Sequence, residues 1–247
     1  MQIHEEHIIP ALDDFAERAA DFLVERIRRA VRDGRPCSVI LAGGTTPRPV
    51  YAGLSRRLGA LPAGLGTLSF FIGDERVVAP ESPERNERMI REAFGAFFDE
   101  THKRLYPWEP PPLSAPAAAA RYERTLAGYF QGPRAKPDLA VLGLGADGHT
   151  ASLFPNAVVL RRTKETEPVG PTLPGRAVAV FRPDEKAWRL SLTARFLSQS
   201  REVVFLIGGR NKGAAYRSLK TGDQSLPAAW IAGPTITVFA LGEALAD

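Results

Sequence analysis

Residues 138–155 read DLAVLGLGADGHTASLFP, a short apolar run that gives way to a loop of glycines and polar side chains. The apolar run is continuous rather than alternating, as in a strand of a parallel sheet that is covered on both faces. Three glycines then follow with G-x-G-x-x-G spacing, which favours a tight turn directly after the strand. The stretch therefore predicts a strand that ends at a loop carrying Asp147 and His149.

Five similar apolar runs, several of them followed by glycine, lie at residues 38–42, 68–72, 177–181, 202–207 and 236–240. Between them, apolar residues recur with helical spacing at 15–31 and near 47–59, 84–98, 117–130, 190–199 and 210–220. Alternating strands and helices are typical of a doubly wound sheet with right-handed crossovers. We expect an α/β fold with a mostly parallel sheet of about six strands, helices on both faces, and a single domain over residues 1–247.

Composition limits the class of protein. The chain has 247 residues, 44% of them hydrophobic, which suits a soluble globular protein with a large core. Its net charge of +4 comes without a basic tail, so a small anionic ligand is expected and nucleic acid is not. Cys37 is the single cysteine, which excludes an internal disulfide and a cysteine-cluster metal site. Without a secretion signal or a membrane-spanning run, we expect a cytoplasmic chain with no membrane contact.

Two further loops follow predicted strands, and in a parallel sheet ligands bind beyond the carboxyl ends of the strands. The first loop reads Gly43-Gly44-Thr45-Thr46-Pro47, whose N–H groups at the start of a helix would bind an anion, with phosphate expected. The alternative is a capped turn without a ligand, in which the threonine hydroxyls cap the helix. The second loop reads Gly73-Asp74-Glu75-Arg76 and places three charges at the same edge, where they either serve function or face solvent.

The G-x-G-x-x-G spacing alone would fit a dinucleotide site, but three features oppose that interpretation. Pro155 follows soon after Gly148, so the long crossover helix of a Rossmann unit is cut short or bent. The next predicted strand ends at Arg182 rather than at an acidic residue. Asp147 and His149 are reactive groups that a pyrophosphate cradle does not need. We therefore expect this loop to carry chemistry.

Together the three loops resemble the family of glucosamine-6-phosphate isomerases and 6-phosphogluconolactonases. The resemblance runs in order along nearly the whole chain, with Asn86 after the second loop and then the segments Arg189-Leu190-Ser191-Leu192-Thr193 and Gly208-Gly209-Arg210-Asn211-Lys212. The third loop is the most specific block and is similar to the lactonases, whereas aminosugar-phosphate deaminases share the first two. One departure is Arg85-Asn86-Glu87-Arg88, where the family more often has Ser-Asn-Tyr-Arg.

The resemblance implies a sheet of the sugar-phosphate isomerase type and a cytosolic enzyme without a metal or an organic cofactor. The implied reaction is hydrolysis of 6-phosphoglucono-δ-lactone to 6-phosphogluconate in the oxidative pentose phosphate pathway. His149 is the expected general base, because an imidazole titrates near pH ~6.5. Asp147 or Asp74 would orient the ring or the substrate, and Arg76 or a loop N–H would stabilise the oxyanion. No G-x-S-x-G motif is present, so we expect direct attack by water.

The substrate itself is expected to lie against residues of the first loop and against side chains that follow later strands. The phosphate would meet the loop N–H groups and the ammonium of Lys212, with Arg189 or Arg182 adding a bidentate contact. The full set expected to bind substrate is Gly43, Gly44, Thr45, Thr46, Asn86, Arg189 and Lys212.

Two other functions stay open from the sequence. An aminosugar-phosphate deaminase or isomerase would use the same sheet, but its histidine loop usually continues Ile-Ala-Phe-Asn-Glu, whereas residues 150–155 here supply no carboxylate. A non-catalytic sugar-phosphate-binding module of a transcription regulator needs a DNA-binding element, and only one helix is predicted before the first strand. Nothing in the sequence demands more than a monomer.

Overall fold

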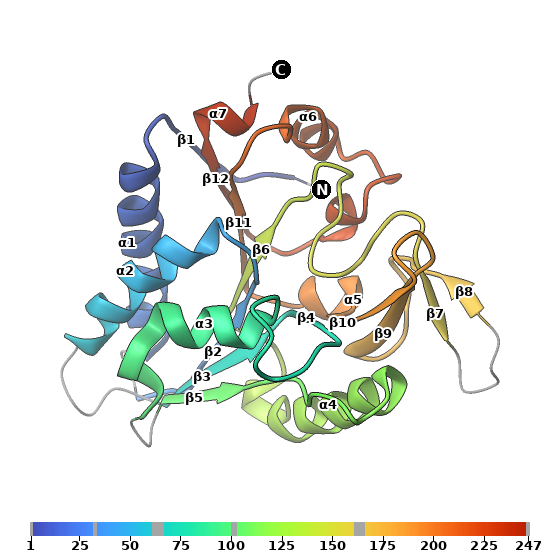
Figure 1. The fold of residues 1–247 in the computed structure, drawn as a ribbon. Helices are drawn as coiled ribbons and strands as arrows, with labels where there is room; N and C mark the ends of the chain where they lie inside the picture. Colours follow the sequence, from blue (N-terminus) through green and yellow to red (C-terminus); the bar gives the residue numbers. More distant parts are fainter. Residues whose placement is uncertain (1, 32–33, 61–66, 100–102, 161–165, 246–247) are drawn as a thin grey trace.

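A seven-stranded sheet lies at the centre of the computed structural model, which describes residues 2–31, 34–60, 67–99, 103–160 and 166–245 (Figure 1). Its order is β1-β12-β11-β6-β2-β3-β5, and all of its strand pairs are parallel. The strands are β1 (Glu5–Ile9), β2 (Cys37–Leu41), β3 (Leu68–Ile72), β5 (Lys103–Tyr106), β6 (Leu139–Gly143), β11 (Glu202–Ile207) and β12 (Ile236–Leu241). The predicted α/β class and the mostly parallel sheet are confirmed.

Helices pack around this sheet (Figure 1). They are α1 (Leu12–Val31), α2 (Pro47–Gly59), α3 (Asn86–Phe94), α4 (Ala115–Tyr129), α5 (Ala194–Leu197), α6 (Gly213–Thr221) and α7 (Gly242–Leu245), with 3-10 turns η1 (Gly95–Asp99), η2 (Gly132–Arg134) and η3 (Pro227–Trp230). In α1 the residues Phe15, Ala19, Leu23 and Ile27 recur every four positions and are buried. Acidic residues in its first turn and arginines in its last turn favour the helix dipole.

A second, five-stranded antiparallel sheet lies beside the first, in the order β4-β10-β9-β7-β8. Its strands are β4 (Asp74–Arg76), β7 (Val158–Leu160), β8 (Thr166–Pro168), β9 (Ala177–Arg182) and β10 (Ala187–Leu192). The sequence predicted residues 177–181 as a strand of the parallel sheet and 190–199 as a helix, and both details are wrong. The run 177–181 forms a hairpin with β10, and only Ala194–Leu197 is helical.

Two strands of the central sheet, β1 and β5, were not predicted from the sequence, because they begin with charged rather than apolar residues. β1 begins Glu5-Glu6-His7 and β5 begins Lys103-Arg104. Both lie at the edges of the sheet, where charged side chains discourage pairing with another chain. The described part of the chain holds no helix with the length and apolar composition needed to cross a membrane.

Candidate active site

A cavity of about 390 Å³ opens where β2, β3, β6 and β11 end. It gathers most of the residues that the sequence singled out: Gly43, Gly44, Thr45, Thr46, Asp74, Arg76, Asn86, His149 and Lys212. Of the others, Asp147 contacts His149 from outside the cavity wall, and Arg189 lines a neighbouring hollow. The structure therefore brings these residues together at the carboxyl edge of the sheet, and their roles in binding and catalysis stay predictions.

The imidazole of His149 is paired with the carboxylate of Asp147 in the loop after β6. Asp147 Oδ1 lies 2.5 Å from Nδ1 of His149 and also accepts from its backbone N–H at 3.2 Å. A carboxylate only accepts, so Nδ1 carries the proton and Nε2 the lone pair of the neutral ring. Burial alone would raise the pKa of Asp147, but the hydrogen bond and charge of His149 outweigh it and lower this pKa to about 2. The pair can present Nε2 as a base.

Gly145 is required for this pairing. A Cβ built on residue 145 would lie 2.0 Å from Nδ1 of His149 and 2.5 Å from Oδ1 of Asp147. The turn is closed by backbone bonds between residues 145 and 149 (2.8 Å) and between 148 and 145 (3.1 Å). The glycine spacing that resembled a dinucleotide fingerprint thus makes room for an acid–imidazole pair. The described residues from 149 to 157 contain no helix, so the crossover helix of a Rossmann unit does not follow this loop.

Asp74 lies at the side of the cavity and contacts a different partner. Its Oδ2 accepts from the hydroxyl of Ser152 at 2.7 Å. Burial raises the pKa of Asp74, opposed by that hydrogen bond and by the charges of Arg76, His149 and Arg189. Of the two carboxylates left open by the sequence, Asp147 is the one hydrogen-bonded to His149.

Arg76 and Asn86 form a connected pair at the same side. Arg76 donates through Nη1 to Asn86 Oδ1 at 2.7 Å and to the carbonyl of Glu84 at 2.9 Å. Asn86 in turn donates to the carbonyl of Asp74 at 2.8 Å. Gly43 allows this approach, because a Cβ there would lie 2.0 Å from Asn86 Oδ1. Both of these bonds use Nη1, and no described residue is hydrogen-bonded to Nη2 or Nε.

Glu75 is fully buried, although the sequence suggested a charge for substrate or solvent. Its Oε1 accepts from the backbone N–H groups of Arg76 (2.8 Å) and Asn86 (2.7 Å), and its Oε2 accepts from that of Glu87 (2.8 Å). These bonds join the end of β4 to the first turn of α3, where N–H groups have no partner within the helix. Burial raises the pKa of Glu75 to about 7, against the lowering effect of the three backbone bonds.

The other side of the cavity is formed by the starts of two helices. Gly44 (φ +97°), Thr45 and Thr46 lead into α2, and Lys212 is the N-cap of α6. The side chain of Thr46 makes no capping hydrogen bond, so the alternative of a capped turn is wrong for this residue. The N-termini of helices favour anions through their unpaired N–H groups, and here a lysine lines the same cavity.

The two candidate arginines of the second sheet lie outside the cavity. Arg189 lines an adjoining hollow of about 540 Å³ that shares Gly44, Thr45, Arg76 and Asn86 with the cavity, and its Nη2 pairs with Glu185 at 2.5 Å. Arg182 pairs with Asp184 at 2.6 Å and with Glu185, and contacts the ring of Phe154.

Other residues of the cavity wall were missed by the sequence analysis. Thr150 and Ala151 line it beside His149, and Gly208 lines it beside Thr46. Thr150 is held by a bond from its hydroxyl to the carbonyl of Gly143 at 2.8 Å. Thr150, Ala151 and Gly208 could have been found from their positions in loops that follow predicted strands. Nothing in the sequence distinguished the buried Glu75 from its charged neighbours.

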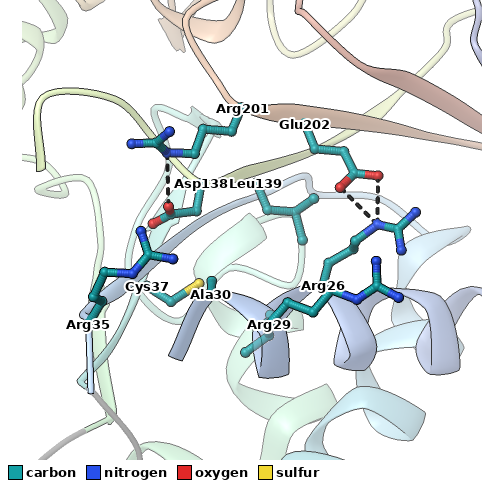
Figure 2. A pocket seen from close by; sticks show the side chains of 10 residues that line it. Arg26, Arg29, Ala30, Arg35, Cys37, Asp138, Leu139, Arg201 and Glu202 are labelled. Carbon is teal, nitrogen blue, oxygen red and sulfur yellow. Dashed lines mark hydrogen bonds and ion pairs between the residues drawn. The ribbon is translucent and has the colours of Figure 1, made fainter. Parts of the chain in front are cut away.

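A different hollow, of about 330 Å³, lies at the opposite edge, where β2, β6 and β11 begin (Figure 2). Its arginines are largely paired: Arg26 donates to both oxygens of Glu202, and Arg201 lies 3.4 Å from Asp138. Burial raises the pKa of the Cys37 thiol at its floor, which makes this thiol a poor nucleophile. The hollow thus offers neither an imidazole nor an activated nucleophile.

The chain is similar to known proteins over most of its length. Residues 10–239 match the family model described as glucosamine-6-phosphate isomerases/6-phosphogluconolactonase. The chain belongs to this family. It is 34% identical over 221 residues to a 6-phosphogluconolactonase of Synechocystis sp., covering 87% of this chain and 85% of the relative. It is 31% identical over 234 residues to that of Thermotoga maritima, covering 90% and 94%.

Solved structures in this family have the same fold. The crystal structure of 6-phosphogluconolactonase from Thermotoga maritima matches with a TM-score of 0.77 at 26% identity, covering 96% of this chain and 98% of that one. The enzyme from Leishmania guyanensis also matches with a TM-score of 0.77, at 22% identity, covering 97% of each chain.

The buried carboxyl of this family member predicts a pH-dependent stability. Glu75 binds its proton more tightly in the folded chain, with a pKa of about 7, than in the unfolded chain, with about 4.5. The stability linked to that proton is present at low pH and is lost as pH rises through 7. Between pH 5 and 8, the free energy of unfolding should fall by up to about 3 kcal/mol relative to a Glu75→Gln variant, since one pKa unit is about 1.4 kcal/mol.

Urea unfolding of both chains across this pH range measures the difference. Because the Gln side chain does not titrate, its curve supplies the background from all other groups. A difference that stays constant from pH 5 to 8 would contradict the assignment.

Proposed function

We propose that the chain hydrolyses 6-phosphoglucono-δ-lactone to 6-phosphogluconate in the oxidative pentose phosphate pathway. The observation that carries the proposal is one cavity with a carboxylate-paired imidazole on one side and two helix N-termini with a lysine on the other. This matches a substrate that has a cyclic ester at one end and a phosphate at the other. Relatives that are 34% and 31% identical over most of their length carry the name 6-phosphogluconolactonase.

The phosphate end is assigned to the first loop and Lys212. The N–H groups of Gly44, Thr45 and Thr46 at the start of α2 would donate to phosphate oxygens, and the ammonium of Lys212 would neutralise charge. Arg189 would contact the substrate from the adjoining hollow, which opens beside Gly44 and Thr45.

The ester end is assigned to His149. Nε2 takes a proton from water as the water oxygen bonds to the lactone carbonyl carbon, and the carbonyl oxygen becomes an oxyanion. The bond from that carbon to the ring oxygen then breaks, and the imidazolium returns its proton to the leaving oxygen. The product is an open-chain acid, which loses a proton to solvent.

Four other side chains support this sequence of steps. Asp147 holds Nδ1 and stabilises the imidazolium. Arg76, through Nη2 or Nε, would stabilise the oxyanion, a contact whose loss typically costs roughly 3–4 kcal/mol. Asp74 and Asn86 would hold substrate hydroxyls. Water, an imidazole and fixed donors suffice, so the proposal includes no metal or organic cofactor.

We also propose that the chain acts as a single domain and a monomer in the cytoplasm. Residues that follow four strands of the one parallel sheet meet in the cavity, which supports a single domain. The substrate, a small phosphosugar lactone, gives no reason for contact with nucleic acid or a membrane.

The direct test is proton release from freshly prepared lactone, recorded at constant pH and corrected for spontaneous hydrolysis. We expect acid release with no ammonia and no change in nicotinamide absorbance. Ammonia from an aminosugar phosphate would instead indicate the deaminase reaction, and binding without turnover would indicate a sensor module.

Two variants separate the ends of the site. His149→Ala should lower kcat by about 10²–10⁴ with KM nearly unchanged, because it removes the base. Lys212→Ala should mainly raise KM, by about tenfold, because it removes a ground-state contact to phosphate. Steady-state rates measure both effects, with His4→Ala and Lys220→Ala as matched controls outside the cavity. Full turnover by His149→Ala would refute the assignment of the base.

Gly145 gives a test of the turn itself. Gly145→Ala should lower kcat by about 10² or more, because the new methyl group displaces His149 from Asp147. Gly128→Ala is the matched control, since Gly128 lies inside α4 with no atom within 4 Å of an added Cβ. Equal activity of the two variants would show that the pairing does not matter for catalysis.

A further inference from the structure

Phe154, at the end of the histidine loop, packs against the imidazole of His149. The two ring centroids lie 4.4 Å apart with an interplanar angle of 40°. Phe154 is buried, with 8% of its surface exposed, whereas the side chain of His149 is 33% exposed and reaches the cavity. The aromatic ring thus forms a wall for an imidazole that is otherwise accessible.

Arg182, at the end of β9, contacts the same phenyl ring. Its Cζ lies 4.0 Å from the ring centroid of Phe154, within the range of a cation–π contact. The guanidinium is itself held by Asp184 at 2.6 Å and by Glu185, and only 18% of its side chain is exposed. Its Nη1 and Nη2 thus donate to these carboxylates, and Arg182 joins the second sheet to the histidine loop.

The surroundings of this stack do not suit a substrate contact. The hollow beside it measures about 70 Å³ and is lined by Asp147, Phe154, Arg182 and Asp184 with residues 155–157. This volume is small for a sugar phosphate. Arg182 does not line the cavity that holds His149 and Lys212, which argues against the phosphate contact considered for it from the sequence.

We propose that Phe154 and Arg182 are positioning residues that fix the plane of the His149 imidazole. Asp147 holds the ring through Nδ1, but one hydrogen bond leaves the ring free to tilt about that contact. Packing against Phe154 removes this freedom, and Arg182 keeps the phenyl ring in place. Nε2 is then directed into the cavity, where small misplacements of a base cost rate steeply. This inference rests on the proposed function for the meaning of Nε2 as a base.

The kinetic test compares Phe154→Leu with Phe181→Leu. Leucine retains apolar volume at 154 but removes the flat ring, and Phe181 is a matched phenylalanine on β9 that packs on Trp188 at 5.2 Å. We expect Phe154→Leu to lower kcat about tenfold with less than a twofold change in KM, and Phe181→Leu to change neither. Equal kcat for both variants would overturn the proposal.

The role of Arg182 is tested by substitutions that remove or keep its positive charge. Arg182→Met should lower kcat in the same direction, and Arg182→Lys should restore most of it, because lysine keeps a cation near the ring. A rise in KM with unchanged kcat in Arg182→Met would instead identify a substrate contact and overturn the positioning role.

The NMR signals of the His149 imidazole distinguish a local change at this ring from a general loss of folding. They can be recorded whether or not the chain has the proposed activity. The imidazole protons of His149, assigned by their loss in His149→Gln, should shift in Phe154→Leu because the phenyl ring current is removed, and should stay unchanged in Phe181→Leu. Unmoved signals would overturn the stack. If the unaltered chain did not open the lactone, the proposed function would fail, while these shifts would still decide whether Phe154 lies against the imidazole.

Discussion

Four neighbouring parallel strands, β11, β6, β2 and β3, end at one edge of the sheet, and the site depends on this common edge. Each strand end supplies a different part: Lys212 after β11, His149 after β6, Thr45 after β2 and Arg76 after β3. These residues are far apart in sequence, and only the parallel register brings them to one cavity. The side chains of these strands are buried in the core. Their packing therefore determines where the candidate site forms.

The strand ends alone would not hold polar side chains in place. Contacts with the backbone of neighbouring loops fix their positions. Glu75 ties β4 to the start of α3 through three N–H groups, which fixes both Arg76 and Asn86. Gly43 and Gly145 let side chains approach the main chain more closely than any other residue would allow. A buried carboxylate is costly unless it is fully hydrogen-bonded, and here its bonds go to groups that a helix start leaves unpaired.

Much of this could be predicted from the sequence, for identifiable reasons. Continuous apolar runs such as 202–207 predicted the central strands correctly, because strands buried on both faces read as unbroken hydrophobic segments. The run 177–181 looked the same but pairs with β10, since periodicity cannot tell which sheet a strand joins. The lining residues after β2, β3 and β6 followed from their positions at strand ends. The burial of Glu75 and the contact of Phe154 with His149 could not be predicted, because both depend on how an irregular loop folds back on itself, which hydrophobic periodicity does not report.

The way in which Glu75 is bonded has a consequence for how such a site can diversify. Its carboxylate accepts from main-chain N–H groups, so these three bonds do not require particular side chains at positions 76, 86 and 87. The side chains of Arg76 and Asn86 add their own bonds to the carbonyls of Glu84 and Asp74. A shared scaffold can in this way carry different reactions on phosphorylated sugars, with the framework inherited and only the groups that face the ligand replaced.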